Sequence, residues 1–190
     1  SWFEQKGYAL GYQWGNHDRT RFYHTLDGIH YDTLQDDPRP PNDRSNEHAL
    51  VFEPDGTIRM LLRRDHSEHH SSSALLGTSR PPYNKWTWHP LGIKMGGPSL
   101  IRLPDGQLLT VVRRYAEGPD GGWGSQWTEL GLIDPLKSSY APKLKLPSGG
   151  DSSYAGLVWR ENILWVSYYS SHEGKTSIYL AKVTEINSEN

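Results

Sequence analysis

The stretch Pro54-Asp55-Gly56-Thr57-Ile58-Arg59-Met60-Leu61-Leu62-Arg63-Arg64 joins a tight-turn signal to an apolar run that ends in two arginines. It predicts a hairpin turn followed by a β-strand, because Asp-Gly supplies the positive φ angles that short hairpin turns need. The pattern recurs as Pro104-Asp105-Gly106-Gln107-Leu108-Leu109-Thr110-Val111-Val112-Arg113-Arg114, an offset of 50 residues (105 − 55). A period of roughly 40–50 residues, built from short strands and glycine turns, is typical of β-propeller blades.

Two further units follow the same pattern. The turn residues of the four units, spaced by 49, 50 and 56 residues, are Gly7, Gly56, Gly106 and Asn162. The residues seven positions after each turn are Trp14, Arg63, Arg113 and Tyr169. No segment shows the 3.6-residue apolar period of a helix. The sequence therefore predicts an all-β fold, a β-propeller of about four blades, each an antiparallel four-stranded sheet.

We expect one β-propeller domain over residues 1–190, with blades at about 1–40, 41–92, 93–148 and 149–190. Ser1-Trp2 reads as the middle of a strand, and the last unit lacks a clear fourth strand. A blade cannot bury both of its faces alone, so we expect a partial ring whose N-terminal blades are missing. Blade faces left open in this way also predict self-association. A targeting signal would then lie outside this sequence.

The composition narrows the class of ligand. The formal net charge of −2 gives no global basic field, so a nucleic-acid partner is not expected. Aromatic residues make up 12% of the chain, with 8 Trp and 11 Tyr against 3 Phe, which excludes a disordered chain. Trp and Tyr combine a large apolar body with one polar group. They therefore suit packing between sheets, which is the commoner use, or stacking on sugar rings.

The chain has no Cys, which excludes disulfides, thiolate metal sites and a Cys nucleophile. No run of about 18 apolar residues is present, so no membrane span is expected. The compartment is left undetermined, with a secreted or periplasmic location as one option. His66, His69 and His70 lie close together in a polar segment, where a solvated loop is commoner than a metal site. The sequence predicts no metal and no cofactor.

Four motifs, taken with their order along the chain, resemble the sialidase superfamily. Thr25-Leu26-Asp27-Gly28-Ile29-His30-Tyr31 is similar to an Asp-box shortened by one residue. Asn46-Glu47 opens a blade, Pro-Asp-Gly hairpins lead to arginines, and Ser153-Tyr154 opens the last blade. Sialidase-like proteins are six-bladed propellers and glycoside hydrolases. The resemblance implies that this chain corresponds to their C-terminal four blades.

The resemblance also implies a role for individual residues. Tyr154 corresponds to the nucleophile and Glu47 to the glutamate that takes its proton. The other candidates, expected to bind the substrate or orient an arginine that does, are Arg63, Arg64, Arg113, Arg114, Tyr169 and Glu173. In each arginine pair, one member would clamp a substrate carboxylate. The acid/base aspartate and a further arginine belong to the family's first two blades, which this sequence lacks.

The chemistry of these residue types fits an acidic sugar. An arginine guanidinium pairs bidentately with a carboxylate. A phenol nucleophile with a glutamate base avoids the repulsion between two carboxylates that an anionic substrate would otherwise meet. Because the ordinary pKa of Tyr is about 10, Glu47 would have to accept its proton.

Each candidate also has a purely structural explanation. Paired arginines at a strand end are commonly a solvated rim, and a ring of like charge there protects a sheet edge. Tyr154 could fill the space between blades, and Glu47 could cap a turn or pair with Arg63. Asp151, which follows Gly149-Gly150, is either a turn residue or a site carboxylate.

Three functions follow as hypotheses. The first is a portion of a sialidase-like glycoside hydrolase that cleaves a terminal acidic sugar. The second is a non-catalytic carbohydrate-binding propeller that uses Trp and Tyr side chains for stacking. The third is a structural module whose open blade faces recruit blades from another chain.

Overall fold

The computed structural model describes residues 1–13, 19–65, 71–117 and 123–186. Within these ranges the chain forms strands and no helix, so none of the described residues belongs to a helix that could cross a membrane. The strands are β1 (Trp2–Phe3), β2 (Lys6–Tyr12), β3 (Thr20–Thr25), β4 (Asp32–Asp36), β5 (Ser45–Phe52), β6 (Ile58–Arg64), β7 (Leu75–Ser79), β8 (Trp86–Pro90), β9 (Gly96–Arg102), β10 (Leu108–Glu117), β11 (Trp123–Asp134), β12 (Ser139–Lys145), β13 (Ser153–Arg160), β14 (Ile163–Ser170) and β15 (Ser177–Val183).

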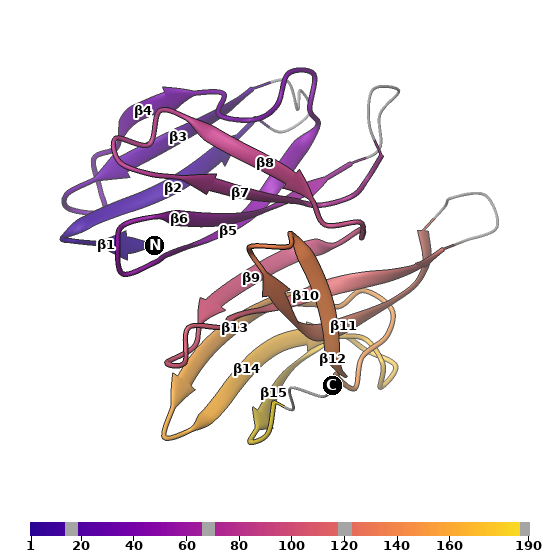
Figure 1. Cartoon of the computed structure of the whole chain (residues 1–190). Helices are drawn as coiled ribbons and strands as arrows, with labels where there is room; N and C mark the ends of the chain where they lie inside the picture. The colour runs from indigo at the N-terminus through magenta and orange to yellow at the C-terminus, as the bar shows by residue number, and fades with distance from the viewer. Residues whose placement is uncertain (14–18, 66–70, 118–122, 187–190) are drawn as a thin grey trace. The chain divides into compact units, whose positions relative to one another are not determined.

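These strands form four antiparallel sheets, each a simple meander in chain order (Figure 1). The first three sheets have four strands each: β1–β4, β5–β8 and β9–β12. The last sheet, in the order β13-β14-β15, has three strands within the described residues. The predicted all-β propeller with about four blades is confirmed. As expected from the sequence, no fourth strand of the last blade is found within the described residues.

The repeated Pro-Asp-Gly motif forms the turn between the first two strands of the second and third sheets. Gly56 and Gly106 have φ angles of +82° and +92°, which favour glycine. The carboxylates of the preceding aspartates fix the turns. Asp55 Oδ1 accepts a hydrogen bond from the Thr57 amide at 2.9 Å, and Asp105 Oδ1 accepts one from the Gln107 amide at 3.0 Å. The two copies of the 50-residue repeat therefore form the same kind of turn.

The first predicted turn, Glu4-Gln5-Lys6-Gly7, is formed by its first two residues and not by the glycine. Glu4 and Gln5 adopt the positive φ angles, 45° and 66°, between β1 and β2, whereas Gly7 lies inside β2. Gly7 is needed there for packing, because a Cβ atom would lie 2.7 Å from the Thr25 methyl carbon. At the fourth turn the prediction is right, since Asn162 has a φ of 60° between β13 and β14. Trp14, predicted at the template position of the first unit, lies outside the described residues.

The Asp-box-like segment forms a side-chain-locked turn between β3 and β4. Asp27 Oδ1 accepts hydrogen bonds from the amides of Ile29 and His30, both at 2.8 Å. The same device closes the β11–β12 hairpin, where Asp134 Oδ1 accepts from the amides of Leu136 and Lys137 at 2.9 and 3.0 Å. An aspartate that receives two backbone amides is a general turn lock, so these segments organise the blade ends.

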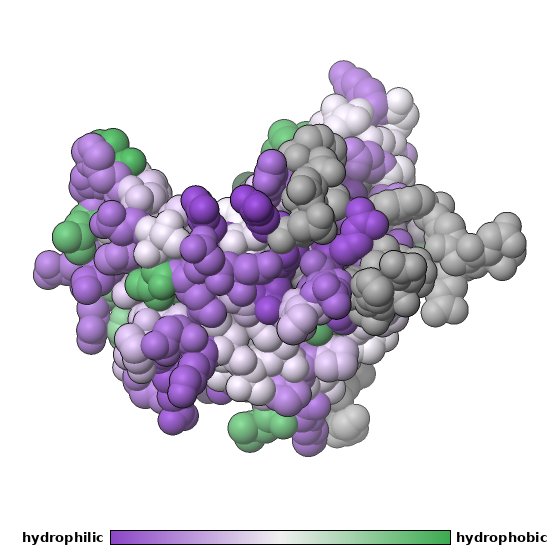
Figure 2. Space-filling model, turned by 90° about the horizontal axis from the view of Figure 1, so that it is seen from above, coloured by the Kyte–Doolittle hydropathy of each residue, from purple (hydrophilic) through white to green (hydrophobic). Residues whose placement is uncertain are grey.

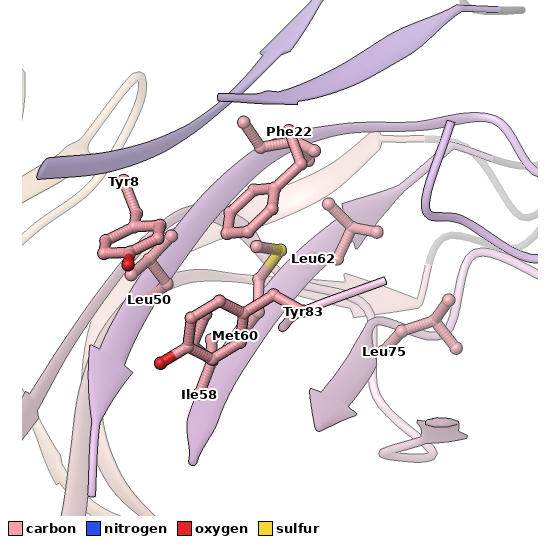
Figure 3. Packing of buried hydrophobic residues seen from close by; sticks show 9 residues of the cluster. Tyr8, Phe22, Leu50, Ile58, Met60, Leu62, Leu75 and Tyr83 are labelled. Atoms are coloured by element: carbon pink, nitrogen blue, oxygen red, sulfur yellow. The ribbon is translucent and has the colours of Figure 1, made fainter. Parts of the chain in front are cut away.

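The chain divides into two compact units, residues 1–93 and 94–190. In the first unit, side chains from the first two sheets point into one shared core (Figure 3). Its buried members are Tyr8, Leu10, Phe22, Leu50, Ile58, Met60, Leu62, Leu75 and Tyr83. Trp86 and Trp88 lie against this core and stack on each other, with ring centroids 5.2 Å apart. Most of the aromatic content of this unit therefore packs sheets together.

The second unit has a core of its own between the last two sheets. Its buried members are Leu103, Leu109, Val111, Leu130, Leu146, Leu164, Val166, Tyr168 and Val183. Burial alternates along β13 and β15, as expected for a sheet packed on one face. The other face carries exposed apolar side chains, namely Val158, Ile178 and Leu180. Self-association through such a face stays a prediction.

Candidate functional site

One group of predicted site residues lies in the second unit, where β10, β13 and β14 meet. We call Arg113, Asp151, Tyr154 and Tyr169 the Arg113 cluster. Nη2 of Arg113 lies 2.9 Å from Asp151 Oδ1 and donates a 2.7 Å hydrogen bond to the Tyr169 hydroxyl. The Tyr169 hydroxyl donates to Asp151 Oδ1 at 2.7 Å, and Arg113 Nε donates to the Ser152 carbonyl at 2.7 Å. The cluster is therefore a closed hydrogen-bonded triangle with one backbone anchor.

Tyr154 forms the exposed side of this cluster. Its ring stacks on that of Tyr169, with centroids 6.0 Å apart and planes at 14°, and Arg113 Cζ lies 5.7 Å from its centroid. Tyr154 is 55% exposed, whereas Arg113 is only 9% exposed. An aromatic ring of fixed orientation thus faces solvent next to a carboxylate and a guanidinium. Such an arrangement can stack on the apolar face of a sugar and hydrogen-bond its hydroxyls.

The backbone that presents Tyr154 is strained. Ser153 and Tyr154 have φ angles of 151° and 48°, both unusual for residues other than glycine, and the β13–β14 register shifts here. Such conformations cost on the order of 1–3 kcal/mol each and concentrate at functional positions. Gly97 in β9 makes the bend possible. It has a φ of +50°, and a Cβ atom there would overlap Ser153 Oγ and lie 3.2 Å from the Tyr154 amide nitrogen.

Tyr169 is a hydrogen-bond donor and not an ionised group at neutral pH. Burial, together with the hydrogen bond to Asp151, raises the pKa of Tyr169 to about 12. A phenol of that pKa keeps its proton and holds the Asp151 carboxylate in place. Tyr169 stands in the last blade where other blades have Arg63 and Arg113, seven residues after the turn. There it orients the Asp151 carboxylate.

A second group of predicted residues lies in the first unit. Glu47 Oε1 lies 2.9 Å from Arg63 Nη1, and Asp65 Oδ1 lies 3.3 Å from Arg63 Nη2. Asn46 donates a 2.8 Å hydrogen bond to Asp65 Oδ2 and accepts one from the Glu47 amide at 2.7 Å. We call Asn46, Glu47, Arg63 and Asp65 the Glu47 group. The Glu47–Arg63 ion pair in this group is the one expected if Glu47 has a purely structural role.

The second arginine of each pair points to the other face of its strand, as alternation requires. Arg64 Nε lies 2.7 Å from the buried carboxylate of Asp43. Arg114 Nε lies 3.1 Å from Glu129 Oε1, and Tyr140 also donates to Glu129, at 2.7 Å. Both arginines take part in interior ion pairs, which favours a structural role for them.

Glu173 bonds to a residue outside the Arg113 cluster. Its carboxylate accepts a 2.9 Å hydrogen bond from the Tyr179 hydroxyl, at an exposed position after β14.

Sequence reasoning left Asp151 undecided, and the structure places it in the cluster. Sequence reasoning missed Gly97, although the Gly96-Gly97 pair at a strand start is a recognisable sign of close backbone approach. Glu47 and Tyr154 lie in different units, so their joint role stays a prediction.

The described residues include no group of three or more acidic or histidine side chains that could hold a metal ion. His66, His69 and His70 lie outside the described residues. The arrangement of the Arg113 cluster offers hydrogen-bonding and stacking chemistry to a ligand.

No known family model matches this sequence, and no curated protein sequence matches it. Solved structures do. An uncharacterised protein from Dyadobacter fermentans has a TM-score of 0.68 at 18% identity, over 86% of this chain and 45% of that chain. The GH43B protein of a Bacteroides ovatus xyloglucan locus has a TM-score of 0.68 at 15% identity, over 98% and 39%.

An endo-1,4-β-xylanase from Bacteroides thetaiotaomicron has a TM-score of 0.67 at 14% identity, over 99% of this chain and 70% of that chain. The chain has a glycoside-hydrolase-like propeller fold. It spans less than half the length of the Dyadobacter fermentans and Bacteroides ovatus proteins. The similar structures support a β-propeller, and they give no support to six blades or to the sialidase superfamily in particular.

Proposed function

We propose that this glycoside-hydrolase-like propeller binds a carbohydrate at the Arg113 cluster, and that the sugar there is neutral. The observation that carries the proposal is the exposed ring of Tyr154, fixed by its stack on Tyr169 beside the Arg113–Asp151 pair. Sugar-binding sites commonly combine an aromatic platform with a few oriented polar groups. The strained backbone at Tyr154 supports the same proposal, since the chain tolerates that strain to present this side chain.

The charge balance supports a neutral sugar. Each arginine predicted to clamp a carboxylate already pairs with a carboxylate of the protein. The pairs are Arg63 with Glu47 and Asp65, Arg64 with Asp43, Arg113 with Asp151, and Arg114 with Glu129. An anionic sugar would have to displace one of these carboxylates or bind beside it, at an electrostatic cost. Similar structures include a xylan β-1,4-xylosidase, an endo-1,4-β-xylanase and an endo-arabinase, and xylose and arabinose themselves carry no charge.

Figure 2 shows one face of the molecule, on which hydrophilic side chains prevail and apolar ones are scattered. The test is affinity electrophoresis and calorimetry with neutral glycans, xylan and arabinan, against the acidic trisaccharide sialyllactose. We expect measurable binding to at least one neutral glycan and none to sialyllactose. Binding of sialyllactose alone would overturn the neutral-sugar assignment.

The sialidase-like mechanism predicted from the sequence is the second candidate. It is favoured by one observation, the exposed Tyr154 hydroxyl-bearing ring next to the Arg113 guanidinium. In that mechanism Tyr154 attacks the sugar and Glu47 takes its proton. Tyr154→Phe keeps the ring and removes the nucleophile, so an enzyme of this kind loses turnover and keeps binding. A carbohydrate-binding propeller keeps its binding and shows no turnover before or after the change.

A further inference from the structure

A pocket of about 370 Å³ opens on the second unit beside the segment that carries Asp151. Its lining residues are Ser125, Gln126, Trp127, Lys145, Ser148, Gly149 and Gly150, and we call it the Trp127 pocket. They come from the start of β11, the end of β12 and the connection between β12 and β13. The volume falls in the range of small-ligand sites. None of these residues belongs to the Arg113 cluster.

Trp127 is held in a fixed orientation in this pocket. Its indole Nε1 donates a 2.8 Å hydrogen bond to Glu129 Oε2, and Glu129 is itself buried and bonded to Arg114. The polar group of the ring is thereby satisfied within the sheet, and the indole is one of the side chains that line the pocket. Lys145 Nζ lies over one face of the ring, 4.7 Å from its centroid, so a sugar that stacks on that face displaces the ammonium. An indole ring pinned in this way can stack on the C–H face of a sugar at little entropic cost.

The rest of the lining offers polar groups of the kinds that can bond to sugar hydroxyls. Gln126 offers an amide that donates and accepts, Ser125 offers a hydroxyl, and Lys145 offers an ammonium donor. Ser148 is already engaged, because its hydroxyl donates to the Leu146 carbonyl and accepts from the Thr128 amide. Gly149 and Gly150 complete the lining, and a Cβ atom at these positions would lie against His172 and Ser171 respectively.

One short segment of the chain connects the pocket to the Arg113 cluster. Gly150 directly precedes Asp151, so their Cα atoms lie about 3.8 Å apart. Gly149 is tied to the end of β14, since its amide donates to Ser170 Oγ at 3.1 Å and its carbonyl accepts from the Ser171 amide at 3.1 Å. Tyr169 of the cluster directly precedes Ser170 at the end of β14. The two sites are therefore held in register by the same short segment.

We propose that the Trp127 pocket is a second sugar subsite, and that the ligand is an oligosaccharide of two or more units. One unit lies against Tyr154, and a neighbouring unit of the same chain stacks on Trp127. This inference rests on the proposed function and specifies it, because it assigns a glycan chain and not a single sugar as the ligand. Affinity then grows with chain length until both positions are filled.

The test uses the full chain and two series of probes, xylose to xylohexaose and arabinose to arabinohexaose, measured by calorimetry. For the series that binds, we expect at least a tenfold gain in affinity between the monosaccharide and the trisaccharide. Trp127→Ala removes that gain and leaves monosaccharide affinity within about twofold. Trp127→Phe keeps an aromatic platform but loses the bond to Glu129, and it retains most of the gain.

Trp165→Ala is the matched control. Trp165 also has a lysine over its ring, with Lys182 Nζ 5.8 Å from the centroid, but it does not line the Trp127 pocket. This variant keeps the chain-length gain, and circular dichroism verifies that all variants fold. Equal affinity for monosaccharide and trisaccharide in the unmodified chain, or a gain that survives Trp127→Ala, overturns the subsite and leaves the proposed function standing. Absence of binding in both series overturns both.

Discussion

The guanidinium of Arg113 and the carboxylate of Asp151 lie 2.9 Å apart, and the hydroxyl of Tyr169 bonds to both. An arginine that is satisfied in this way is not an empty receptor for a substrate carboxylate. It instead holds Asp151 and Tyr169 in a defined geometry beneath the exposed Tyr154. The same guanidinium anchors the segment before β13 through the Ser152 carbonyl, so the site and the blade entry depend on one side chain.

Replacing Arg113 therefore destabilises the second unit. Arg113→Ala removes bonds to a buried carbonyl, a carboxylate and a phenol, and we expect a loss of about 3 kcal/mol in the free energy of unfolding, measured in urea. Arg21→Ala is the control, because Arg21 forms an exposed ion pair with Asp36. Exposed pairs contribute about 0–1 kcal/mol. Equal losses for the two variants would contradict the structural role of Arg113.

Gly97→Ala tests the close approach of β9 to the start of β13. The substitution places a methyl group at a φ of +50° and against Ser153 and Tyr154. Gly92→Ala is a matched control, because Gly92 also has a positive φ, +72°, but nothing lies within 4 Å of its Cβ position. We expect about 1 kcal/mol of destabilisation for the control and at least about 1 kcal/mol more for Gly97→Ala, from overpacking. Similar melting curves for both would show that the contact is unimportant.

Glu129→Gln probes the interior ion pair behind Trp127. The carboxylate accepts from Arg114, Trp127 and Tyr140. An amide offers a single acceptor oxygen and places an NH₂ group against these donors, so we expect a loss of about 2–3 kcal/mol. Chemical denaturation measures it. A loss under about 0.5 kcal/mol would mean that the network is not formed.

Partly buried His48 gives the fold a dependence on pH. Burial lowers its pKa to about 4, and its Nε2 accepts a hydrogen bond from the Leu10 amide at 3.2 Å, which requires the neutral ring. The unfolded chain, with a pKa near 6.5, binds the proton first as the pH falls. Stability is therefore fully present above about pH 6.5 and is lost between about pH 6.5 and 4, by up to about 3 kcal/mol.

His48→Gln keeps an acceptor near the Leu10 amide and removes the titration. Urea unfolding at pH 7, 6, 5 and 4 measures the difference between the two proteins. We expect the unmodified chain to lose stability relative to the variant over this range. Parallel pH profiles would show that His48 does not titrate in this way. Carboxylates are common to both proteins, so their contribution cancels in the comparison.

The sequence predicted the blades well because their signals are local. Asp55-Gly56 and Asp105-Gly106 define a turn within four residues, and the apolar runs that follow define the strands. At the first turn, however, Glu4 and Gln5 adopt positive φ without any glycine, so the signal was absent and Gly7 was misassigned. The nearest glycine was serving a packing contact with Thr25, which only the pairing of β2 with β3 reveals.

The site was less predictable because its partners are distant in sequence. Arg113 meets Tyr169, 56 residues away, and Ser152, 39 residues away. Sequence spacing places Arg63 and Arg113 at equivalent positions, but it does not show which carboxylates neutralise them. The expectation of an acidic sugar came from the sialidase resemblance, in which arginines clamp a substrate carboxylate. The pairing of Arg113 with Asp151 could not be foreseen from that resemblance, and the choice of Tyr154 as a site residue remains a prediction with new support.

The most direct test of the central claim is the affinity of Tyr154→Ala for the neutral glycan that the unmodified chain binds. Tyr31→Ala is the control, since Tyr31 is 51% exposed, close to the 55% of Tyr154, and lies in the first unit. We predict at least a tenfold loss of affinity, about 1.4 kcal/mol, for Tyr154→Ala and less than twofold for Tyr31→Ala. Equal affinities for Tyr154→Ala and the unmodified chain would contradict the assignment of the Arg113 cluster as the carbohydrate site.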